Sequence, residues 1–240
     1  MFYWEHTCTT PAEDLALDEA LLEQAEQGTE PHEVLRLWEP RRPMVVLGRS
    51  SQFSIEANAE ECRRRDVAIV RRSSGGAAIV TGPGCLMYSV VLSYALRPAL
   101  RSIDEAHRCV LETVLTAIRP HVPDAVRRGT SDLAVGERKF SGNSLRCRRE
   151  HLLYHGTLLY DFPLDLIPAC LGTPPRQPDY RAGRPHEAFV MNLPCSRASL
   201  IDGLRKAWDA MEPLPSPPQE LVQELADAKY RQSTWTEQLP

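Results

Sequence analysis

The sequence predicts an α/β domain, on three observations. Apolar runs bounded by glycine, proline or charge are typical of buried strands, and Val67–Val70 and Leu86–Leu92 are two of them. Longer segments with one apolar and one charged side, Thr10–Gln27 and Ser102–Ile118, predict amphipathic helices. The 240 residues, of which 42% are hydrophobic and 25% charged, suit one such domain or two small ones.

Charge and cysteine content exclude several classes of protein. A formal net charge of −4 argues against a general nucleic-acid binder. The first residues lack the basic start and apolar core of a signal peptide, and no apolar run has the length of a membrane span. The seven cysteines are irregularly spaced without a CxxC pair, which indicates reduced thiols rather than disulfides or a zinc site. We therefore expect a cytoplasmic protein.

The N-terminal helix has clear boundaries. Thr10 is a suitable N-cap before a proline, acidic residues crowd the early turns, and Gly28 ends the pattern. We expect Asp18 and Glu19 of this helix to face solvent.

A hairpin and a second helix are predicted to follow. Glu33–Glu39 alternates in polarity and Met44–Leu47 is apolar, with a proline-rich turn between them, so the two segments read as a pair of strands. Ile55–Asp66 reads as a helix whose last turn carries three arginines, and we interpret these as a solvated helix end.

The central stretch, residues 67–92, combines three strand candidates with an arginine- and glycine-rich bend. Val67–Val70, Ala77–Val80 and Leu86–Leu92 are the apolar runs. Glycines allow close backbone approach to a ligand, and the two arginines of the bend, Arg71 and Arg72, favour a phosphate or carboxylate. A hairpin with a solvated basic turn is the alternative.

The C-terminal half continues the alternation. Ser102 with Glu105 suggests a capping box on the helix that follows, and Gly136 with Glu137 forms a tight turn between strands. Thr173–Pro185 is a proline-rich loop, which we expect to act as a lid or crossing segment. The remaining predicted elements are a strand at Leu152–Tyr160 and helices at Leu164–Leu171, Ser199–Met211 and Gln219–Tyr230.

Three segments in this order resemble a known family. RRSSGGAAIV…GCLMYS is similar to the RRxSGGGxVxHDxGxLxYS signature of the lipoate-protein ligases, in the biotin/lipoate A/B protein ligase and octanoyltransferase superfamily. SDLAVGERKFSG is similar to GxNDLxVxGRKxSG, and LLYHGTLLY to LHHGTLLL. The resemblance implies an α/β (α+β) catalytic domain over residues 1–240, with a mixed, largely antiparallel sheet flanked by helices. We expect no C-terminal accessory domain.

The resemblance also implies an activity. Lipoate-protein ligases use ATP and Mg²⁺ to convert lipoate or octanoate into an acyl-adenylate, which a lysine of a lipoyl carrier domain then attacks. The carrier is a dehydrogenase-complex acyltransferase subunit or a protein of the glycine cleavage H type. The magnesium arrives with the nucleotide. Either a separate small accessory protein completes the cycle, or the chain acts only on acyl-AMP made beforehand.

Lys139 is the residue predicted to carry the chemistry. Of the 28 basic residues only Lys139, Lys206 and Lys229 are lysines, so a lysine inside a motif is notable. In the family this lysine contacts both the acyl carbonyl and the phosphate. The resemblance places the following residues around the acyl-adenylate: Arg49, Arg72, Ser74, Gly75, Gly76, Ala77, Ala78, Ile79, Val80, Asp132, Ser141, Gly142, His155 and Gly156.

Two alternative functions remain open. The first is an octanoyltransferase, since members of the superfamily with this activity pass the acyl group through a cysteine thioester without ATP. Cys170 and Cys195 are the candidate nucleophiles here, although Cys170 lies in an apolar segment that favours a packing role. The second alternative is a non-catalytic protein that only binds a lipoyl or biotinyl ligand. It is supported by two departures from the ligase signature: Ala77 replaces a glycine, and Thr81-Gly82 replaces His-Asp. His155 is equally well explained as a core histidine.

Overall fold

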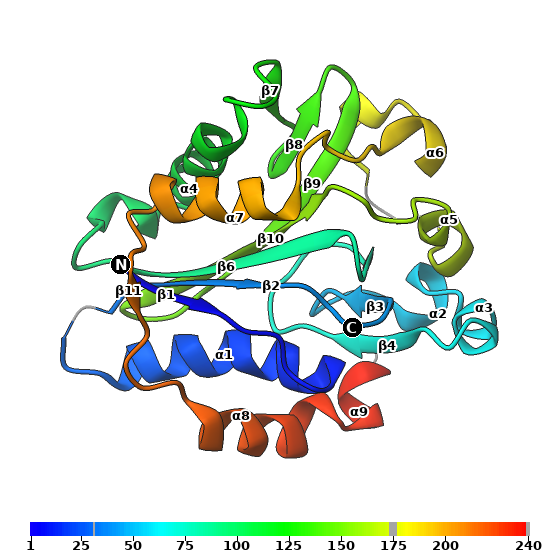
Figure 1. Cartoon of the computed structure of the whole chain (residues 1–240). Coiled ribbons are helices and arrows are strands. Elements are labelled where there is room, and N and C mark those ends of the chain that lie inside the picture. Colours follow the sequence, from blue (N-terminus) through cyan, green and yellow to red (C-terminus); the bar gives the residue numbers. More distant parts are fainter. Residues whose placement is uncertain (31, 173–176, 239–240) are drawn as a thin grey trace.

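An eight-stranded, mostly antiparallel sheet runs through the fold (Figure 1). This computed structural model describes residues 1–30, 32–172 and 177–238. The two pairings that involve β1 are parallel and the other five are antiparallel, so the mixed sheet predicted from the resemblance is confirmed. In spatial order its strands are β11 (Glu212–Pro213), β1 (Phe2–Glu5), β2 (Val34–Trp38), β6 (Cys85–Ser93), β10 (His151–Leu159), β9 (Arg138–Cys147), β8 (Asp132–Val135) and β7 (Ala125–Arg128).

A second sheet of three strands lies beside the first. Its central strand is β3 (Met44–Leu47), which pairs in parallel with β4 (Ala68–Arg71) and antiparallel with β5 (Ile79–Thr81). The predicted hairpin between β2 and β3 is therefore wrong. Pro40 and Pro43, in the segment that joins these strands, have no amide hydrogen for a ladder, and the chain crosses from one sheet to the other instead.

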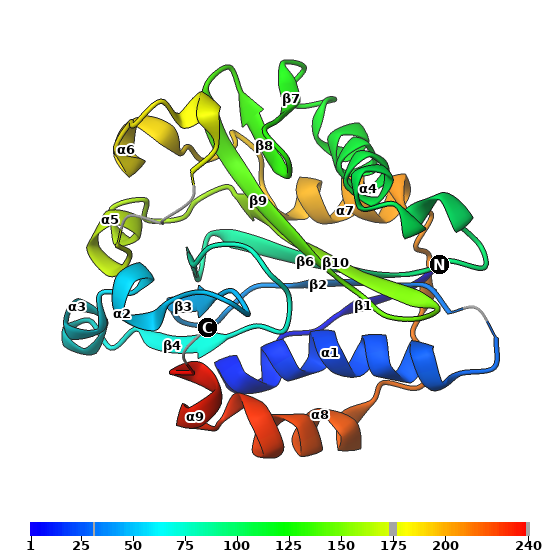
Figure 2. The same ribbon diagram turned by 180° about the vertical axis from the view of Figure 1, so that it is seen from behind.

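Helices cover both faces of the large sheet, with α1 and α8 on one side and α4 and α7 on the other (Figures 1 and 2). In the part of the chain that the structure describes, no helix has the length and apolar character needed to cross a lipid bilayer. The helices are α1 (Pro11–Gln27), α2 (Phe53–Glu56), α3 (Ala59–Arg64), η1 (Pro98–Arg101), α4 (Ile103–Ile118), α5 (Leu166–Cys170), η2 (Asp179–Arg181), α6 (His186–Phe189), α7 (Arg197–Ala207), α8 (Gln219–Leu225), η3 (Ala226–Tyr230) and α9 (Ser233–Thr236).

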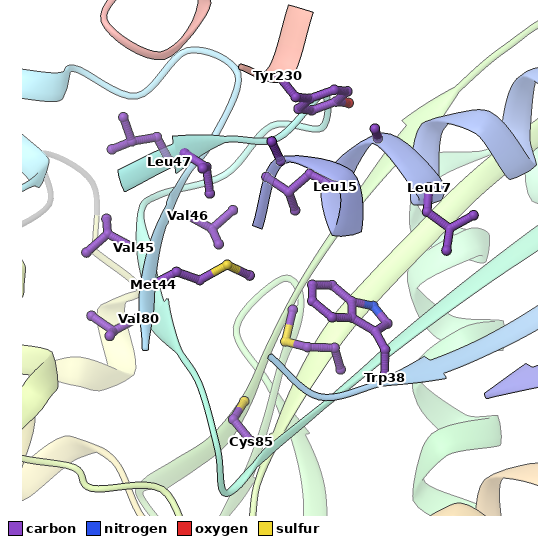
Figure 3. Close-up of a cluster of buried hydrophobic side chains, with 14 of the residues drawn as sticks. Leu15, Leu17, Trp38, Met44, Val45, Val46, Leu47, Val80, Cys85 and Tyr230 are labelled. Carbon is purple, nitrogen blue, oxygen red and sulfur yellow. The ribbon is translucent and has the colours of Figure 1, made fainter. Parts of the chain in front are cut away.

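Alternation along β2 divides its side chains between two cores. Leu35 and Leu37 belong to the core under α4 and α7, whereas Val34 and Trp38 belong to the core under α1. Figure 3 shows Trp38 close to side chains of α1 and β3 in that second core. Arg36 shares this face of the strand and is fully buried, so the same alternation turns a guanidinium toward α1.

The helix predictions were confirmed in position and corrected in detail. Thr10 caps α1 through a reciprocal capping box, while Ser102 precedes α4 without a side-chain hydrogen bond to it. The helix predicted over residues 55–66 is shorter and interrupted: α2 ends at Glu56, and α3 begins after Asn58 and covers Ala59–Arg64. The Asn58 side chain accepts a hydrogen bond from the Glu61 amide and so starts a new helix.

Asp18 and Glu19 do not face solvent, which corrects the expectation for α1. Both are only 3% exposed. Glu19 accepts hydrogen bonds from Lys229 and Tyr230, because the C-terminal helices α8, η3 and α9 cover the side of α1 that a lone helix would leave in water. The predicted helix over residues 219–230 is confirmed as α8 followed by the wider turns of η3.

The proline-rich loop at residues 173–185 is described only in part. Its residues 173–176 lie outside the described residues. The remainder contains η2, and Gln177 and Pro178 contribute to the wall of the cavity described next.

Candidate active site

A cavity of about 420 Å³ lies between the N-terminal part of α1, the small sheet and the β9–β10 pair. Its volume is in the range of small-molecule sites. One part of the wall is apolar and is formed by Leu15, Trp38, Val46, Ala78, Ile79 and Met87. The other part is polar and includes Asp18, Arg72, Ser131, Asp132, Lys139, Asn143, Ser144, His155 and Thr157.

Lys139 and Asp132 form an ion pair in the polar wall. The Lys139 ammonium lies 2.6 Å from one carboxylate oxygen of Asp132, and the Tyr180 hydroxyl donates to the other oxygen at 2.8 Å. The lysine side chain is 25% exposed, so its ammonium stays open to the cavity. Burial and the neighbouring Asp132 raise the pKa of Tyr180, which keeps this hydroxyl protonated as a donor.

Glycines let two groups approach each other closely beside this pair. A Cβ on Gly142 would lie 2.9 Å from the Lys139 ammonium nitrogen, and a Cβ on Gly156 would lie 1.7 Å from the Asn143 amide oxygen. A larger residue at either position would therefore displace the polar wall, which explains in physical terms why the two motifs carry glycine here.

Arg72 lies in the wall, and four of its five N–H groups donate to other groups of the protein. Its guanidinium donates to the carbonyls of Val46 at 3.2 Å, Ala77 at 3.1 Å and Gly75, and to the Ser74 hydroxyl at 3.0 Å. Burial lowers its pKa to about 10, which still leaves it charged at neutral pH. Arg72 therefore shapes the glycine-containing loop through these bonds, and its predicted role in binding a phosphate stays a prediction.

A buried carboxylate, which sequence reasoning missed, holds the same loop from the other side. Glu56 accepts hydrogen bonds from the Ala78 amide at 2.8 Å, the Ser51 hydroxyl at 3.0 Å and the Gln52 amide at 3.0 Å. Among the hydrogen bonds of the described residues, the amides of residues 75–77 donate to no protein group. These amides are available to an anion.

Arg71 and Arg49 lie outside the cavity wall. Arg71 is fully buried and donates to backbone carbonyls, including Gly48 and Thr236, so it joins the loop after β3 to the C-terminal helix. Arg49 is exposed on that same loop.

His155 connects the cavity to a buried cluster of charges. Its Nε2 lies 2.6 Å from the Ser74 hydroxyl and its Nδ1 lies 3.1 Å from Asp18. Burial opposes ionisation of Asp18, but Arg36, His155 and Ser89 outweigh it and hold the pKa of Asp18 below its usual value. His155 is therefore both a buried histidine and a residue of the wall, and the two sequence interpretations are compatible.

Most of the site residues expected from the sequence come together in this wall. Those that line it are Arg72, Gly76, Ala77, Ala78, Ile79, Asp132, Lys139, Gly142, His155 and Gly156. Ser74 and Gly75 contact it through hydrogen bonds to His155 and Arg72, whereas Val80, Ser141 and Arg49 do not line it. Their roles in binding or catalysis stay predictions.

Asp18 and Tyr180 are residues that the sequence reasoning missed. A usable signal existed for the first, because residue 18 lies three positions after Leu15 and four before Leu22, on the apolar side of the helix. Tyr180 carried no such signal.

Neither candidate cysteine lies in the cavity wall. Cys170 is fully buried at the end of α5, and burial raises the pKa of its thiol. Burial also raises the pKa of Cys195. The seven cysteines are all free thiols. In the described ranges, no three histidine, cysteine, aspartate or glutamate side chains gather into a metal-binding group.

Comparison with known proteins agrees with this geometry. Residues 10–197 match the family described as the lipoyl protein ligase A/B catalytic domain. A protein of Aeropyrum pernix, named as a lipoate-protein ligase A, is 35% identical over 152 residues, which cover 62% of this chain and 54% of that protein. The chain thus spans about half the length of this relative. Octanoyltransferase LipM of Geobacillus kaustophilus is 26% identical over 262 residues, covering 94% of this chain and 93% of LipM.

Solved structures share the fold over the whole chain. A lipoate-protein ligase A bound with ATP is 23% identical with a TM-score of 0.82, covering 100% of this chain and 98% of that one. A lipoate protein ligase from Thermoplasma acidophilum with bound lipoic acid is 23% identical with a TM-score of 0.81, covering 99% and 98%. With the family match over residues 10–197, the chain belongs to the lipoyl protein ligase A/B catalytic domain family.

Proposed function

We propose that the chain uses ATP to activate lipoate or octanoate as an acyl-adenylate and transfers the acyl group to a lysine of a lipoyl carrier domain. The observation that carries this proposal is the Lys139 ammonium in the polar wall of a cavity whose other wall is apolar. An acyl chain fits the apolar part, and its carboxylate then lies beside a cation and the amides of the glycine-containing loop.

The proposed reaction has two steps, and the same residues serve both. In the first, a carboxylate oxygen attacks the α-phosphorus of ATP and pyrophosphate leaves. In the second, the carrier's amine attacks the acyl carbonyl, AMP leaves and the amine loses a proton. Negative charge grows on the α-phosphoryl oxygens in the first step, and on the acyl carbonyl oxygen and the departing AMP oxygen in the second. The Lys139 ammonium and the amides of residues 75–77 would stabilise this charge. Magnesium would arrive on the nucleotide's phosphates, with Asp132 as the nearby carboxylate.

Similar proteins support the choice of substrates and partner. Proteins of the same fold have been solved with ATP and with lipoic acid, and a bi-partite lipoate protein ligase of Thermoplasma acidophilum has been described with its E2 lipoyl domain. We propose a lipoyl domain of this kind as the acceptor here. The seven free thiols fit a reducing compartment, and we place the reaction in the cytoplasm.

A cysteine-dependent transferase is the second candidate, because octanoyltransferase LipM aligns with nearly the whole chain. Such an enzyme needs an accessible thiol beside the acyl carbonyl. The described cavity wall contains no cysteine, and burial disfavours the thiolate of both Cys170 and Cys195. The geometry therefore favours adenylation.

Release of pyrophosphate that depends on added lipoate or octanoate tests the proposal. We expect it with ATP and Mg²⁺, and we expect Cys170→Ser and Cys195→Ser each to keep most of the rate. Absence of acid-dependent pyrophosphate, together with octanoyl transfer from an acyl carrier protein and an acyl-thioester trapped on either cysteine, would show the transferase instead.

A further inference from the structure

Four buried side chains from distant parts of the sequence form one hydrogen-bonded series in and beneath the polar wall of the cavity. Asp18 comes from α1, His155 from β10, and Ser74 and Arg72 from the glycine-containing loop. The distances are 3.1 Å from Asp18 to His155 Nδ1, 2.6 Å from His155 Nε2 to the Ser74 hydroxyl, and 3.0 Å from that hydroxyl to Arg72 Nε. Each of the four is less than 9% exposed.

The donors and acceptors determine which atom donates in each of these hydrogen bonds. Arg72 Nε can only donate, so the Ser74 oxygen accepts from it and its own proton is left for His155. Asp18 already accepts from Arg36 at 2.7 Å and from the Ser89 hydroxyl at 2.7 Å, as expected of an ionised carboxylate. His155 Nδ1 must then carry the proton that faces Asp18. Nε2 is the acceptor for Ser74, because a proton there would leave the Ser74 hydroxyl hydrogen without an acceptor among the described residues.

We propose that Asp18 is a positioning residue of this site: by holding His155 in the tautomer protonated at Nδ1, it orients the Ser74 hydroxyl and through it Arg72, which binds the carbonyls that shape the glycine-containing loop. The link to the loop is direct, because the Arg72 guanidinium donates to the carbonyls of Gly75 and Ala77. The effect on acyl-AMP formation rests on the proposed function, whereas the tautomer does not.

The arrangement resembles a serine–histidine–aspartate relay, but Ser74 does not act as a nucleophile. The residue is 1% exposed and it is not part of the cavity wall. Its oxygen also accepts from Arg72, which lowers its reactivity toward a carbonyl. We therefore assign these hydrogen bonds the role of orienting the glycine-containing loop.

Asp18→Asn is the most informative variant, because it keeps the size and changes one atom. Arg36 requires an oxygen at its end of the side chain, so the amide nitrogen must face His155 and Ser89. An N–H donor there forces the proton of His155 to Nε2, and the Ser74 hydroxyl loses its acceptor. Asp14→Asn is the matched control, since Asp14 is equally buried on α1 and bound to Arg36 without contacting His155.

The tautomer is read by nitrogen NMR on protein labelled at histidine, without substrate, with His155→Gln to identify the signal. We expect a proton on Nδ1 in the native protein and in Asp14→Asn, and on Nε2 in Asp18→Asn. Acyl-AMP formation per folded protein should fall on the order of 10²-fold in Asp18→Asn and less than about threefold in Asp14→Asn. A native protein protonated at Nε2 would overturn the proposal, whatever the activity.

Ser74→Ala serves if Asp18→Asn does not fold. We expect it to keep the proton on Nδ1 and still to lose activity on the order of 10²-fold, because the link to Arg72 is cut. Full activity in this variant would contradict the relay. An acyl ester found on Ser74 by mass spectrometry after incubation with an octanoyl donor would also contradict it. If the native protein makes no acyl-AMP, the proposed function fails, and the NMR result alone decides whether Asp18 sets the tautomer.

Discussion

Two groups of opposite charges lie close to the same cavity and differ in their access to water. Arg36 with Asp14 and Asp18 is a dry cluster, with side chains 0% to 4% exposed. Lys139 with Asp132 is a wet pair, 25% and 11% exposed. Both groups have similar distances, 2.6 to 2.7 Å. Distance alone therefore does not separate them.

The difference lies in what each cation has left to bind. Besides the two carboxylates, the Arg36 guanidinium donates to the backbone carbonyls of His6 and Asp14, so it is saturated by the protein. Among the described residues, the Lys139 ammonium has one carboxylate partner and otherwise faces the cavity. A saturated buried ion pair stabilises an arrangement, while an open one can exchange its partner for a ligand.

Removing the cation of the dry cluster should have the largest effect. Arg36→Met leaves Asp14 and Asp18 buried without a positive charge, and we expect a loss of about 3–5 kcal/mol in the free energy of unfolding. Unfolding in urea, followed by circular dichroism, measures it. Arg108→Met removes an exposed pair with Glu105 and should leave stability nearly unchanged. If both variants had the same free energy of unfolding, burial of the Arg36 cluster would not matter for stability, and the comparison of dry and wet charges would fail.

Changing the cation of the wet pair should affect rate and leave stability almost untouched. Lys139→Arg keeps the charge, but Gly142 confines the space beside the ammonium, and a planar guanidinium is wider. We expect acid-dependent pyrophosphate release to fall roughly 10²-fold, or about 2.7 kcal/mol in activation free energy. The neighbouring Arg138→Lys should cost far less. If Lys139→Arg released pyrophosphate at the native rate, Lys139 would not be the catalytic residue and the reaction would take place at another site.

The smallest expected effect is on the stability of the fold at acidic pH. Burial opposes ionisation of Glu19, but Lys229, Tyr230 and Arg146 outweigh it and lower the pKa of Glu19 below its usual 4.5. A carboxyl group with a lowered folded pKa contributes stability that is complete above the unfolded pKa and is lost as the pH falls through the folded value. Melting temperature should therefore drop below about pH 4.5, and less steeply in Glu19→Gln. Glu220→Gln, exposed on α8, should keep the native slope.

Local signals in the sequence were enough for most elements and for the centre of the site. Thr10 with Pro11 marks the start of α1, and continuous apolar runs mark β6 and β10, because caps and such runs depend on neighbouring residues. The lysine of RKFSG and the glycines of three motifs lie together in one cavity wall, as the resemblance implied.

Tertiary structure decided what those local signals could not express. β3 was recognised as a strand, yet its partners β4 and β5 come from residues 21 or more positions away, and only packing selects them over the adjacent β2. Asp18 and Glu19 fit a solvated helix face until Arg36 and the C-terminal helices cover them. The sequence suggested that the Arg72 guanidinium is available to a ligand, whereas in the fold it donates to carbonyls of the glycine-containing loop. The reason is common to all three: hydrogen bonds and burial link residues far apart in the chain, and neither is a property of a short segment.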